Sequence, residues 1–330
     1  MVTDKLPISA SIIVEWYNMS YAELERPKRM LEALRAEAET LRCSDSSTTP
    51  HLSGALELLV VFNSNAVDSA EIQNVFADLV NANALTVRTI PFADATYCEM
   101  KNAGAENARG DIVIFLDCDV VPEPGWLAAF LRAFADPNVS AAVGNTYTDF
   151  SNGATYSKAM ALSWMFPLRE IGDDMSTCAS FHSNNTAFRR ETFLSRRFPH
   201  TQGLTHFPAA LLVERLKQDG ILIWLVGGAR ASHPAPNGAR HFAARALAAG
   251  RARVFSAEPS ARSTVAWVRE DIGTMLYHSK RVVIERSKVG LRWWQIPAAI
   301  VYAVSYDALL LMGSILSVAA PGLMRNRFVL

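Results

Sequence analysis

The sequence predicts an α/β fold with a mostly parallel, mixed β-sheet flanked by helices, and a C-terminal helical appendage that associates with a membrane. Short runs of β-branched and aromatic residues alternate with amphipathic helical stretches, which is the pattern of a sheet built with right-handed crossovers. A nearly uninterrupted apolar stretch from residue 293 onward predicts the appendage. The chain has 330 residues, and 50% of them are hydrophobic, which is enough for one large core.

The expected elements follow one another with short polar breaks between them. Apolar residues at helical spacing, such as Met30, Leu31 and Leu34, mark the helices, and short apolar runs bounded by turn residues mark the strands. Strands are expected at residues 9–14, 55–62, 85–91, 111–116, 139–147 and 221–226. Helices are expected at residues 21–42, 67–80, 97–107 and 126–134 and within 203–220, and a turn at 233–238 follows the last strand.

Two carboxylates, Asp117 and Asp119, stand at the end of the fourth strand. The run Ile112–Leu116 is too short for a helix and reads as a strand buried on both faces, into which ionised carboxylates cannot extend unpaired. They are therefore expected at the carboxyl end of the strand, where open α/β sheets bind ligands, with both side chains on one side. Two such oxygen ligands suit Mg²⁺ or Mn²⁺ that is also bound by substrate phosphates. The alternative is an aspartate capping the helix near Pro124, which explains only one of the two.

The composition narrows the class of protein. Lysine plus arginine equals aspartate plus glutamate, at 32 each, so no basic field indicates nucleic-acid binding. The cysteines are scattered without the spacing of a metal site or a disulfide framework, which favours a reducing compartment. Residues 1–7 lack the charged-then-apolar pattern of a signal peptide, so export is not expected.

Four ordered segments carry a family resemblance. Residues 101–110, KNAGAENARG, lead directly into the strand and the Asp-x-Asp pair, and this arrangement resembles the family 2 glycosyltransferases of the GT-A fold. Residues 11–18 look like the first strand and nucleotide loop of that family, and residues 183–191 look like its acceptor-side segment. The resemblance extends to about residue 235. It implies metal-dependent, inverting transfer of a sugar from a nucleotide-sugar donor.

The resemblance implies roles for the metal-site residues. Asp119 would coordinate the ion, while Asp117 would touch the ribose or a metal-bound water. His233 lies after a strand and before a proline-rich turn, where related enzymes place a histidine near the metal or diphosphate. A neutral imidazole is a reasonable Mn²⁺ ligand, but a hydrogen-bonded structural histidine fits the same position.

Donor-binding residues are expected at the ends of the first two strands. Glu15, Tyr17 and Asn18 follow the first strand and offer an aromatic ring for the base and polar groups for its edge. Asn63 stands where the family usually has an aspartate, so the identity of the nucleotide stays open.

The diphosphate and the acceptor have their own candidates. Lys101 and Asn102 are expected on a helix near the diphosphate, and the alternative for Lys101 is a solvated lysine on the helix surface. Asn184 and Asn185 are expected to bind the acceptor, because a sugar satisfies the hydrogen bonds that buried amides require. The alternative is an asparagine-rich turn leading into a helix.

The general base is less clearly marked. The family usually places an acidic pair before the helix at 209–216, whereas this chain has His206 followed by Phe-Pro-Ala. We rank His206 first because its usual pKa suits the task, and group it with Glu214 and Asp117 as catalytic. Asp173 and Asp174 are further alternatives.

The C-terminal stretch predicts contact with lipid. Trp293 and Trp294 precede the apolar run 296–324, which is long enough to cross a bilayer core, and a basic approach comes before them: Lys280, Arg281, Arg286, Lys288 and Arg292. Asp307 interrupts the run, so a shallow or re-entrant helix competes with a straight span. A helical pair buried on the preceding domain is the soluble alternative.

These expectations combine into three regions: a GT-A catalytic domain at 1–238, an amphipathic basic helical connector at 239–292, and an apolar membrane segment at 293–330. The expected partners are a nucleotide-sugar donor, a glycan or lipid-linked acceptor and the cytoplasmic face of the inner (plasma) membrane, without nucleic acid. A homo-oligomer stays open. The expected role is cell-surface polysaccharide or glycolipid assembly.

Two other functions are compatible with parts of the sequence. A catalytically inactive GT-A-like module that binds nucleotide-sugars would explain the missing base and the missing nucleotide aspartate. A nucleotidyltransferase also uses paired carboxylates, but its glycine-rich phosphate loop is absent after the first strand.

Overall fold

The computed structural model describes residues 9–16, 25–43, 56–81, 85–169, 172–200, 207–256 and 264–320. Contacts between residues divide the chain into two compact units. The first comprises Met1–Thr146, Glu170–His200 and Pro208–Ser232. The second comprises Tyr147–Arg169, Thr201–Phe207 and His233–Leu330.

A mixed β-sheet forms the centre of the first unit. Its strand order is β3-β2-β1-β4-β8-β6-β9-β5, and β7 pairs with β9. The first four of these are parallel: β1 (Ala10–Glu15), β2 (Leu56–Asn63), β3 (Thr86–Phe92) and β4 (Ile112–Asp117). The pairs β4–β8, β6–β8, β5–β9 and β7–β9 are antiparallel. The later strands are β5 (Val121–Pro122), β6 (Ala141–Asp149), β7 (Met175–Cys178), β8 (Asn185–Arg189) and β9 (Ile223–Pro234).

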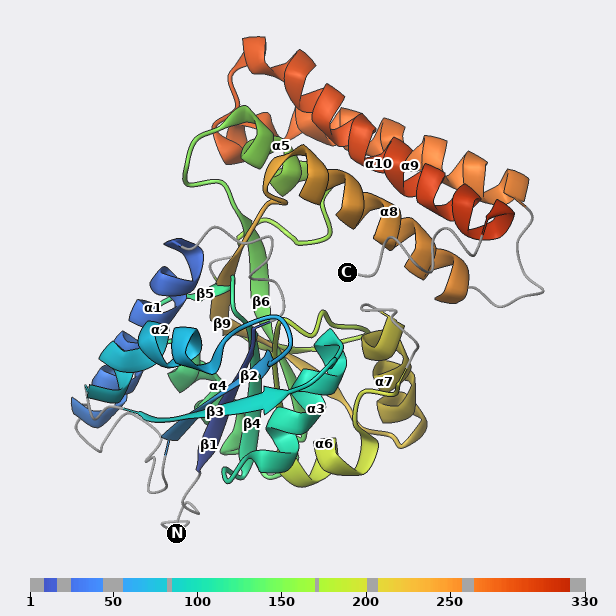
Figure 1. Cartoon of the computed structure of the whole chain (residues 1–330). Helices are drawn as coiled ribbons and strands as arrows, with labels where there is room; N and C mark the ends of the chain where they lie inside the picture. The colour runs from blue at the N-terminus through green and yellow to red at the C-terminus, as the bar shows by residue number, and fades with distance from the viewer. Residues whose placement is uncertain are drawn as a thin grey trace. The chain divides into compact units, whose positions relative to one another are not determined.

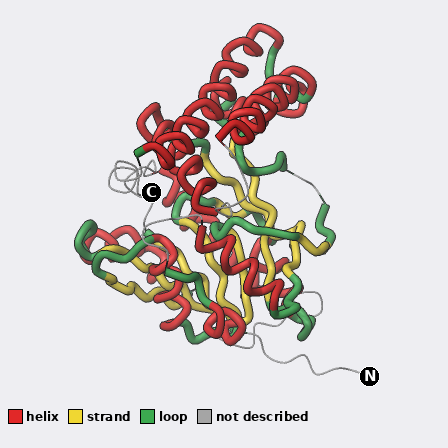
Figure 2. The backbone as a smooth tube through the Cα atoms, turned by 90° about the vertical axis from the view of Figure 1, so that its right-hand side faces the viewer, coloured by secondary structure: helices red, strands yellow, loops and turns green. Residues whose placement is uncertain are grey.

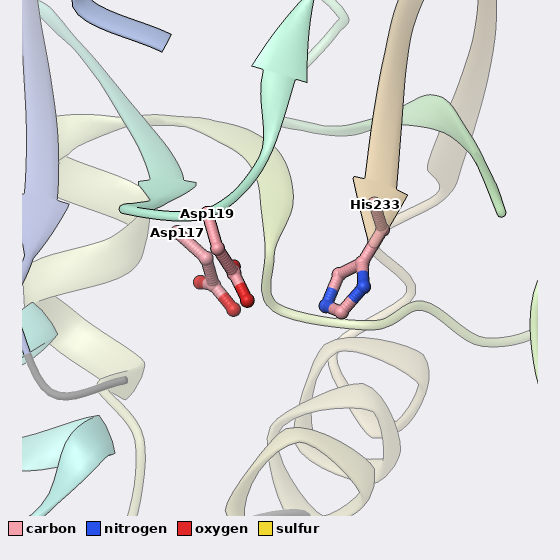
Figure 3. A group of neighbouring side chains, drawn as sticks. All are labelled: Asp117, Asp119 and His233. Atoms are coloured by element: carbon pink, nitrogen blue, oxygen red, sulfur yellow. The ribbon is translucent and has the colours of Figure 1, made fainter. Parts of the chain in front are cut away.

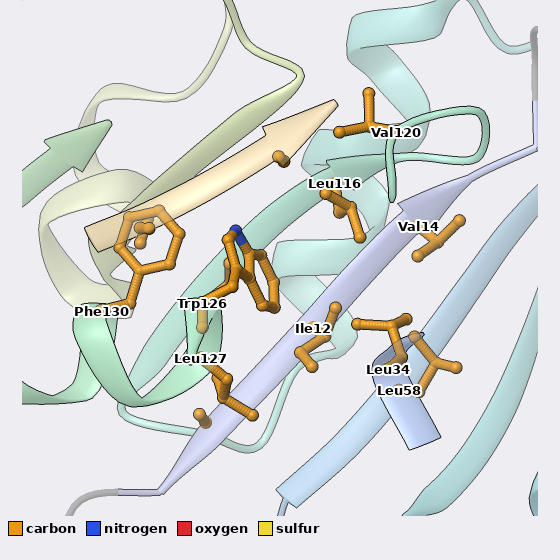
Figure 4. Packing of buried hydrophobic residues seen from close by; sticks show 14 of the residues in the cluster. Ile12, Val14, Leu34, Leu58, Leu116, Val120, Trp126, Leu127 and Phe130 are labelled. Atoms are coloured by element: carbon orange, nitrogen blue, oxygen red, sulfur yellow. The ribbon is translucent and has the colours of Figure 1, made fainter. Parts of the chain in front are cut away.

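Helices cover both faces of this sheet (Figures 1 and 2). Strand alternation sends Ile12 and Val14 to one face and Ile13 to the other. The helices of the first face are α1 (Glu25–Cys43), α2 (Ser69–Asn81) and α4 (Trp126–Phe134). Those of the second face are α3 (Tyr97–Asn107), α6 (Arg190–Arg196) and α7 (Phe207–Gln218). Figure 4 shows the first core, where Trp126 of α4 packs over the strands.

The structure confirms the expected mixed sheet and changes some element boundaries. Helices α3 and α4 span the predicted residues. Strand β9 runs to Pro234, well past the predicted end at 226, because its second half pairs with β5. The turn expected at 233–238 is correspondingly shorter, and helix α8 (Gly238–Ser256) begins at Gly238, whose φ is +73°.

The second unit is built mainly of helices. These are α5 (Thr155–Ser163), α8, α9 (Thr264–Ile284) and α10 (Ile296–Ala319), with short 3₁₀ turns η2 (Arg286–Val289) and η3 (Trp293–Gln295). Helices α8, α9 and α10 lie side by side (Figures 1 and 2). Within the described residues, Trp293–Ala319 is the one helical stretch long and apolar enough to cross a membrane, with a mean hydropathy of 1.8.

Candidate active site

Two aspartates lie at the carboxyl end of β4. Asp117 is the last residue of the strand and Asp119 follows in the turn, and both side chains are buried. The amide of Asp117 donates to the carbonyl of Asn184, and the amide of Val120 donates back to the carbonyl of Asp117. These bonds fix the turn so that both carboxylates project in the same direction (Figure 3).

Strand β9 brings His233 to the aspartates. The antiparallel register of β5 and β9 pairs Val121 with Ser232, the residue before His233. Asp117, Asp119 and His233 each offer one ligand atom, and these atoms lie within 4.8 Å of one another (Figure 3). Two carboxylates and an imidazole are a ligand set that a divalent cation accepts.

The hydrogen bonds of the site are consistent with such an ion. Nδ1 of His233 lies 2.7 Å from the carbonyl oxygen of Pro234, which only accepts, so Nδ1 donates and the neutral ring carries its lone pair on Nε2. The rings of Trp164 and Phe166 pack beside the imidazole. Oδ1 of Asp119 is buried and has no hydrogen-bond partner in the described part of the chain. Since buried carboxylate oxygens need a partner, this atom fits a metal ligand.

Asp117 and Asp119 differ in their surroundings. Asp117 accepts hydrogen bonds from the hydroxyl of Tyr97, at 2.8 and 2.9 Å, and from Nζ of Lys101, at 2.7 Å. Burial, together with the negative charges of Asp117 and Glu15, raises the pKa of Tyr97 well above its usual value, so the phenol stays a donor. Lys101 is completely buried and is therefore not the solvated lysine that the sequence left open. It neutralises Asp117, while Asp119 keeps an oxygen for a ligand.

Arg26 holds the two halves of the site together. It lies in the first turn of α1, and its Nε donates to the carbonyl of Asp119 at 3.0 Å. Its Nη2 donates to the carbonyl of Ser232, at 2.6 Å, and to the Ser232 hydroxyl, at 3.1 Å. No sequence pattern singles out Arg26 as a site residue, because an arginine at a helix start is typical of a solvated side chain.

Helix α1 also fixes the end of the β4–α4 loop that leads into α4. The carboxylate of Glu37 accepts the amides of Gly125 and Leu127, both at 2.7 Å. These amides lie at the start of α4, where the helix offers them no internal acceptor. Gly125 has a φ of +88°, a conformation that favours glycine. The loop between β4 and α4 is thus anchored at both ends.

Asn184 and Asn185 are both predicted to bind the acceptor, but their side chains have different surroundings. Asn185 accepts from Nε1 of Trp126 at 2.8 Å and donates to the carbonyl of Ala229 at 3.1 Å, so its amide supports the core. Asn184 is also buried, but neither atom of its amide has a hydrogen-bond partner among the residues that the structure describes. Continuing the β4–β8 register places Asn184 opposite Asp117. An unsatisfied amide beside the aspartates is suited to a polar ligand.

The predicted donor-binding residues are dispersed around this end of the sheet. Glu15 is buried at the end of β1 and pairs in register with Asp117. The amide oxygen of Asn63 accepts the backbone amide of Asn65 at 3.0 Å, which orders the turn after β2. Asn102 exchanges two hydrogen bonds with the backbone of Phe198. Tyr17 and Asn18 lie outside the described residues.

The candidates for the general base are placed as follows. His206 lies outside the described residues. Glu214 is exposed on α7 and forms an ion pair with Lys217 at 3.1 Å. Asp173 and Asp174 are exposed before β7, and Asp173 pairs with Arg230.

Comparison with known proteins agrees with this architecture. Residues 37–195 match the model of the family described as Glycosyl transferase family 2. A mannosyltransferase from Pyrobaculum calidifontis, PcManGT, aligns with a TM-score of 0.51 and 16% identity over 94% of this chain and 81% of its own. S. aureus TarS, residues 1–349, aligns with a TM-score of 0.51 and 12% identity over 94% of this chain and 92% of its own. These likenesses show the fold.

A further solved structure matches less of its own length. GalNAc-T7 aligns with a TM-score of 0.47 and 13% identity over 71% of this chain and 44% of its own, so this chain spans less than half of that protein. No curated protein sequence matches. The mixed sheet with helices on both faces and the matched stretch that contains β4 and its aspartates agree with the GT-A fold expected from the sequence. Residues 37–195 are therefore similar to glycosyl transferase family 2, and the chain has a GT-A-type fold.

Proposed function

We propose that this protein is a metal-dependent, inverting glycosyltransferase that transfers a sugar from a nucleotide-sugar donor to a glycan or lipid-linked acceptor. The observation that carries the proposal is the cluster of Asp117, Asp119 and His233, with ligand atoms within 4.8 Å of one another. PcManGT is described in complex with GDP-Man and Mn²⁺, and TarS in complex with UDP-GlcNAc, which supports the donor class.

The residues of the cluster would have different roles, as metal ligands or as a contact to the donor. Asp119 and His233 would hold Mg²⁺ or Mn²⁺, whose charge stabilises the leaving nucleoside diphosphate. Asp117 is held in place by Lys101 and Tyr97 and would contact the ribose or a water bound to the ion. Arg26 keeps the Asp119 turn and strand β9 in register, which preserves the distance between the two ligands.

The acceptor side requires a base and a sugar-binding group. In an inverting displacement, the acceptor oxygen attacks the anomeric carbon while a base takes the hydroxyl proton and the diphosphate leaves from the opposite side. We assign the base to His206, with Glu214 as the alternative. Asp117 is less suited to that role, since both its oxygens already accept hydrogen bonds. The side-chain amide of Asn184 has no partner in the described structure, so its Nδ2 can donate to a sugar hydroxyl and its Oδ1 can accept from one.

The cellular role follows from the second unit. Its apolar helix and the basic residues before it support a place at the cytoplasmic face of the inner membrane. Acceptors at such a surface are lipid-linked sugars or growing glycans. We therefore propose a role in the assembly of a cell-surface polysaccharide or glycolipid.

A second candidate function is an inactive nucleotide-sugar-binding module. It is favoured by Asn63, which stands in place of the usual aspartate and uses its amide oxygen to order its own turn. Titration calorimetry with Mn²⁺ and a nucleotide-sugar separates the two functions. Binding with no nucleotide release toward any acceptor would favour the module.

The decisive experiment follows nucleotide release from GDP-mannose and UDP-N-acetylglucosamine with Mn²⁺, Mg²⁺ or EDTA. Asp119→Asn is expected to lower turnover at least about a hundredfold with an unchanged melting temperature, because it weakens an ion ligand without removing a packing group. Asp219→Asn is the matched control, since Asp219 is an exposed partner of Arg196 on the surface. Full activity of Asp119→Asn, or turnover unaffected by EDTA, would refute the metal role.

A further inference from the structure

Helix α10 has the polarity of its faces inverted relative to a helix in water. The face that packs against the other helices is rich in small and polar residues and also holds one aromatic residue, Tyr306. The small and polar residues are Ala299, Ala303, Asp307, Gly313, Ser314 and Ser317. The exposed face is apolar, with Val301 62% exposed, and it also carries Tyr302, Met312, Ile315 and Val318. Water drives apolar side chains inward, so the medium facing these residues is expected to be apolar.

The buried face allows unusually close helix packing. A Cβ at Gly250 of α8 would collide with the main chain of α10 at Leu310, and a Cβ at Gly313 would collide with the main chain of α8 at Leu247. The hydroxyl of Ser314 donates to the carbonyl of Gly250 at 3.1 Å. Small residues and hydroxyl bonds of this kind are how helices associate where hydrophobic burial gives no driving force.

Helix α9, like α10, turns polar groups toward the neighbouring helices and exposes apolar side chains. Its polar groups face its neighbours: Asp271 forms an ion pair with Arg253 of α8, and Nδ1 of His278 lies 2.9 Å from Oδ2 of Asp307. Its exposed side carries Ile272, Leu276, Tyr277, Val283 and Ile284. Both helices therefore expose several large apolar side chains, whereas a soluble protein usually exposes such side chains singly.

A basic rim borders this surface at the connection between α9 and α10. Residues 280–292 hold five basic residues and one acidic residue, Glu285, so their net charge is +4. Trp293 is 73% and Trp294 54% exposed, and the guanidinium of Arg292 lies 5.1 Å from the ring centroid of Trp294. Exposed tryptophans next to cations match the headgroup region of an anionic bilayer.

We propose that the exposed face of α9 and α10 docks on the surface of an anionic lipid bilayer, with both helices lying in the membrane plane. A straight span is disfavoured because α10 is lined by α8 and α9, which carry Arg251, Arg253, Arg269 and Asp271. Those charges would have to enter the hydrocarbon with it. In the in-plane position only the apolar face enters lipid, and Lys280 reaches the headgroups. The proposal deepens the membrane placement in the proposed function and rests on it.

The test is flotation of the purified full chain with phosphatidylglycerol-containing vesicles and with pure phosphatidylcholine vesicles. The wild type is expected to float with the anionic vesicles and less with the neutral ones. Val301→Asp/Met312→Asp is expected to lower vesicle binding about tenfold or more, because two apolar anchors become charged. Leu222→Asp, at a residue of the first unit that is 58% exposed, makes the same kind of change and is expected to bind as the wild type does.

Three outcomes would overturn the proposal. The first is a double variant that floats as the wild type does, and the second is a wild type that does not bind anionic vesicles. The third is a lipid-free wild-type dimer, seen by light scattering, that the double variant converts to monomer, since the face would then bind a second copy. Nucleotide release without lipid is measured in parallel. It is expected to be unchanged in the variant, so a failure of docking is distinguished from a failure of the proposed function.

Depth of insertion separates the in-plane position from a span. Fluorophores on cysteines introduced at 301 and at 315 are quenched by lipids brominated at defined acyl positions. Equal, shallow depths are expected. Depths that differ by about 20 Å, the rise of the helix between these two sites, would show a span and overturn the in-plane position.

Discussion

Nζ of Lys101 lies 2.7 Å from Oδ1 of Asp117, and the lysine side chain is completely buried beneath the aspartate pair. The ammonium also lies 4.6 Å from the ring centroid of Tyr97, which donates to the same carboxylate. A buried carboxylate needs such compensation. The pair therefore compensates the charge of one buried aspartate, while its neighbour Asp119 keeps an oxygen that could bind a metal ion.

Removing the lysine charge is expected to destabilise the protein. Lys101→Met leaves Asp117 buried without its cation, which is expected to cost about 3–5 kcal/mol in the free energy of unfolding. Adding Asp117→Asn should restore part of that loss, since the uncompensated charge is gone. Urea unfolding measures both. Lys217→Met, in the exposed pair with Glu214, is the control and should cost under about 1 kcal/mol. Equal losses in the two lysine variants would contradict the role of Lys101.

Arg26 is expected to act on the metal site as a positioning residue. Arg26→Met removes the bonds to Asp119 and Ser232, and is expected to weaken Mn²⁺ binding about 10- to 100-fold, because the ligands lose their mutual register. Electron paramagnetic resonance titration of Mn²⁺ measures the affinity directly. Arg35→Met, on the same helix in an exposed pair with Glu39, is the control and should leave the affinity unchanged. Unaltered Mn²⁺ affinity in Arg26→Met would remove this role.

Substitution of Asn185 is expected to affect mainly stability, and substitution of Asn184 mainly acceptor binding. Asn185→Ala leaves Nε1 of Trp126 and the carbonyl of Ala229 unpaired and is expected to cost about 2–3 kcal/mol. Asn184→Ala removes an amide with no partner in the described structure, so its melting temperature should hold or rise while KM for the acceptor increases. Thermal unfolding and acceptor kinetics are the two measurements. A large loss of stability in Asn184→Ala with normal kinetics would reverse the assignment.

The stability of the protein is expected to depend on pH through Glu57, which lies near the start of β2. Burial alone would raise the pKa of Glu57, but hydrogen bonds from Ser11, at 2.7 Å, from the Arg109 amide, at 2.6 Å, and from Arg88, at 3.0 Å, hold it below 4.5. Because the pKa is lowered on folding, the stabilisation is complete above pH 4.5 and is lost as the pH falls through the folded value.

Urea unfolding at pH 7 and at pH 3 tests this contribution. Glu57→Gln is expected to cost about 2 kcal/mol at pH 7 and less at pH 3, because the wild-type carboxyl takes up protons as the pH falls toward its lowered folded pKa. Glu39→Gln, at an exposed ion pair, should change stability little at either pH. A cost for Glu57→Gln that does not shrink at acid pH would show that its charge is not responsible.

Local sequence patterns were enough to predict most strands and helices and the two aspartates of the site. Alternating strands and helices from β1 to α4, and the aspartates at the end of β4, could be read from the residues themselves, because burial and periodicity act over a few neighbouring positions. The same patterns could not show that β6 and β8 run antiparallel, or that β9 extends through His233. Strand direction and length depend on partners far along the chain.

The partners of the site residues were decided by the tertiary structure. Arg26 meets Asp119 across 93 positions and Ser232 across 206, and no local pattern marks such a contact. The contrast between Asn184 and Asn185 likewise arises from what each face of β8 meets, not from the residue type. For α10, hydropathy alone predicted contact with lipid, but only packing against α8 and α9 decides which face is available for it. Composition sets what a segment prefers to contact, and the fold sets what is left for it to contact.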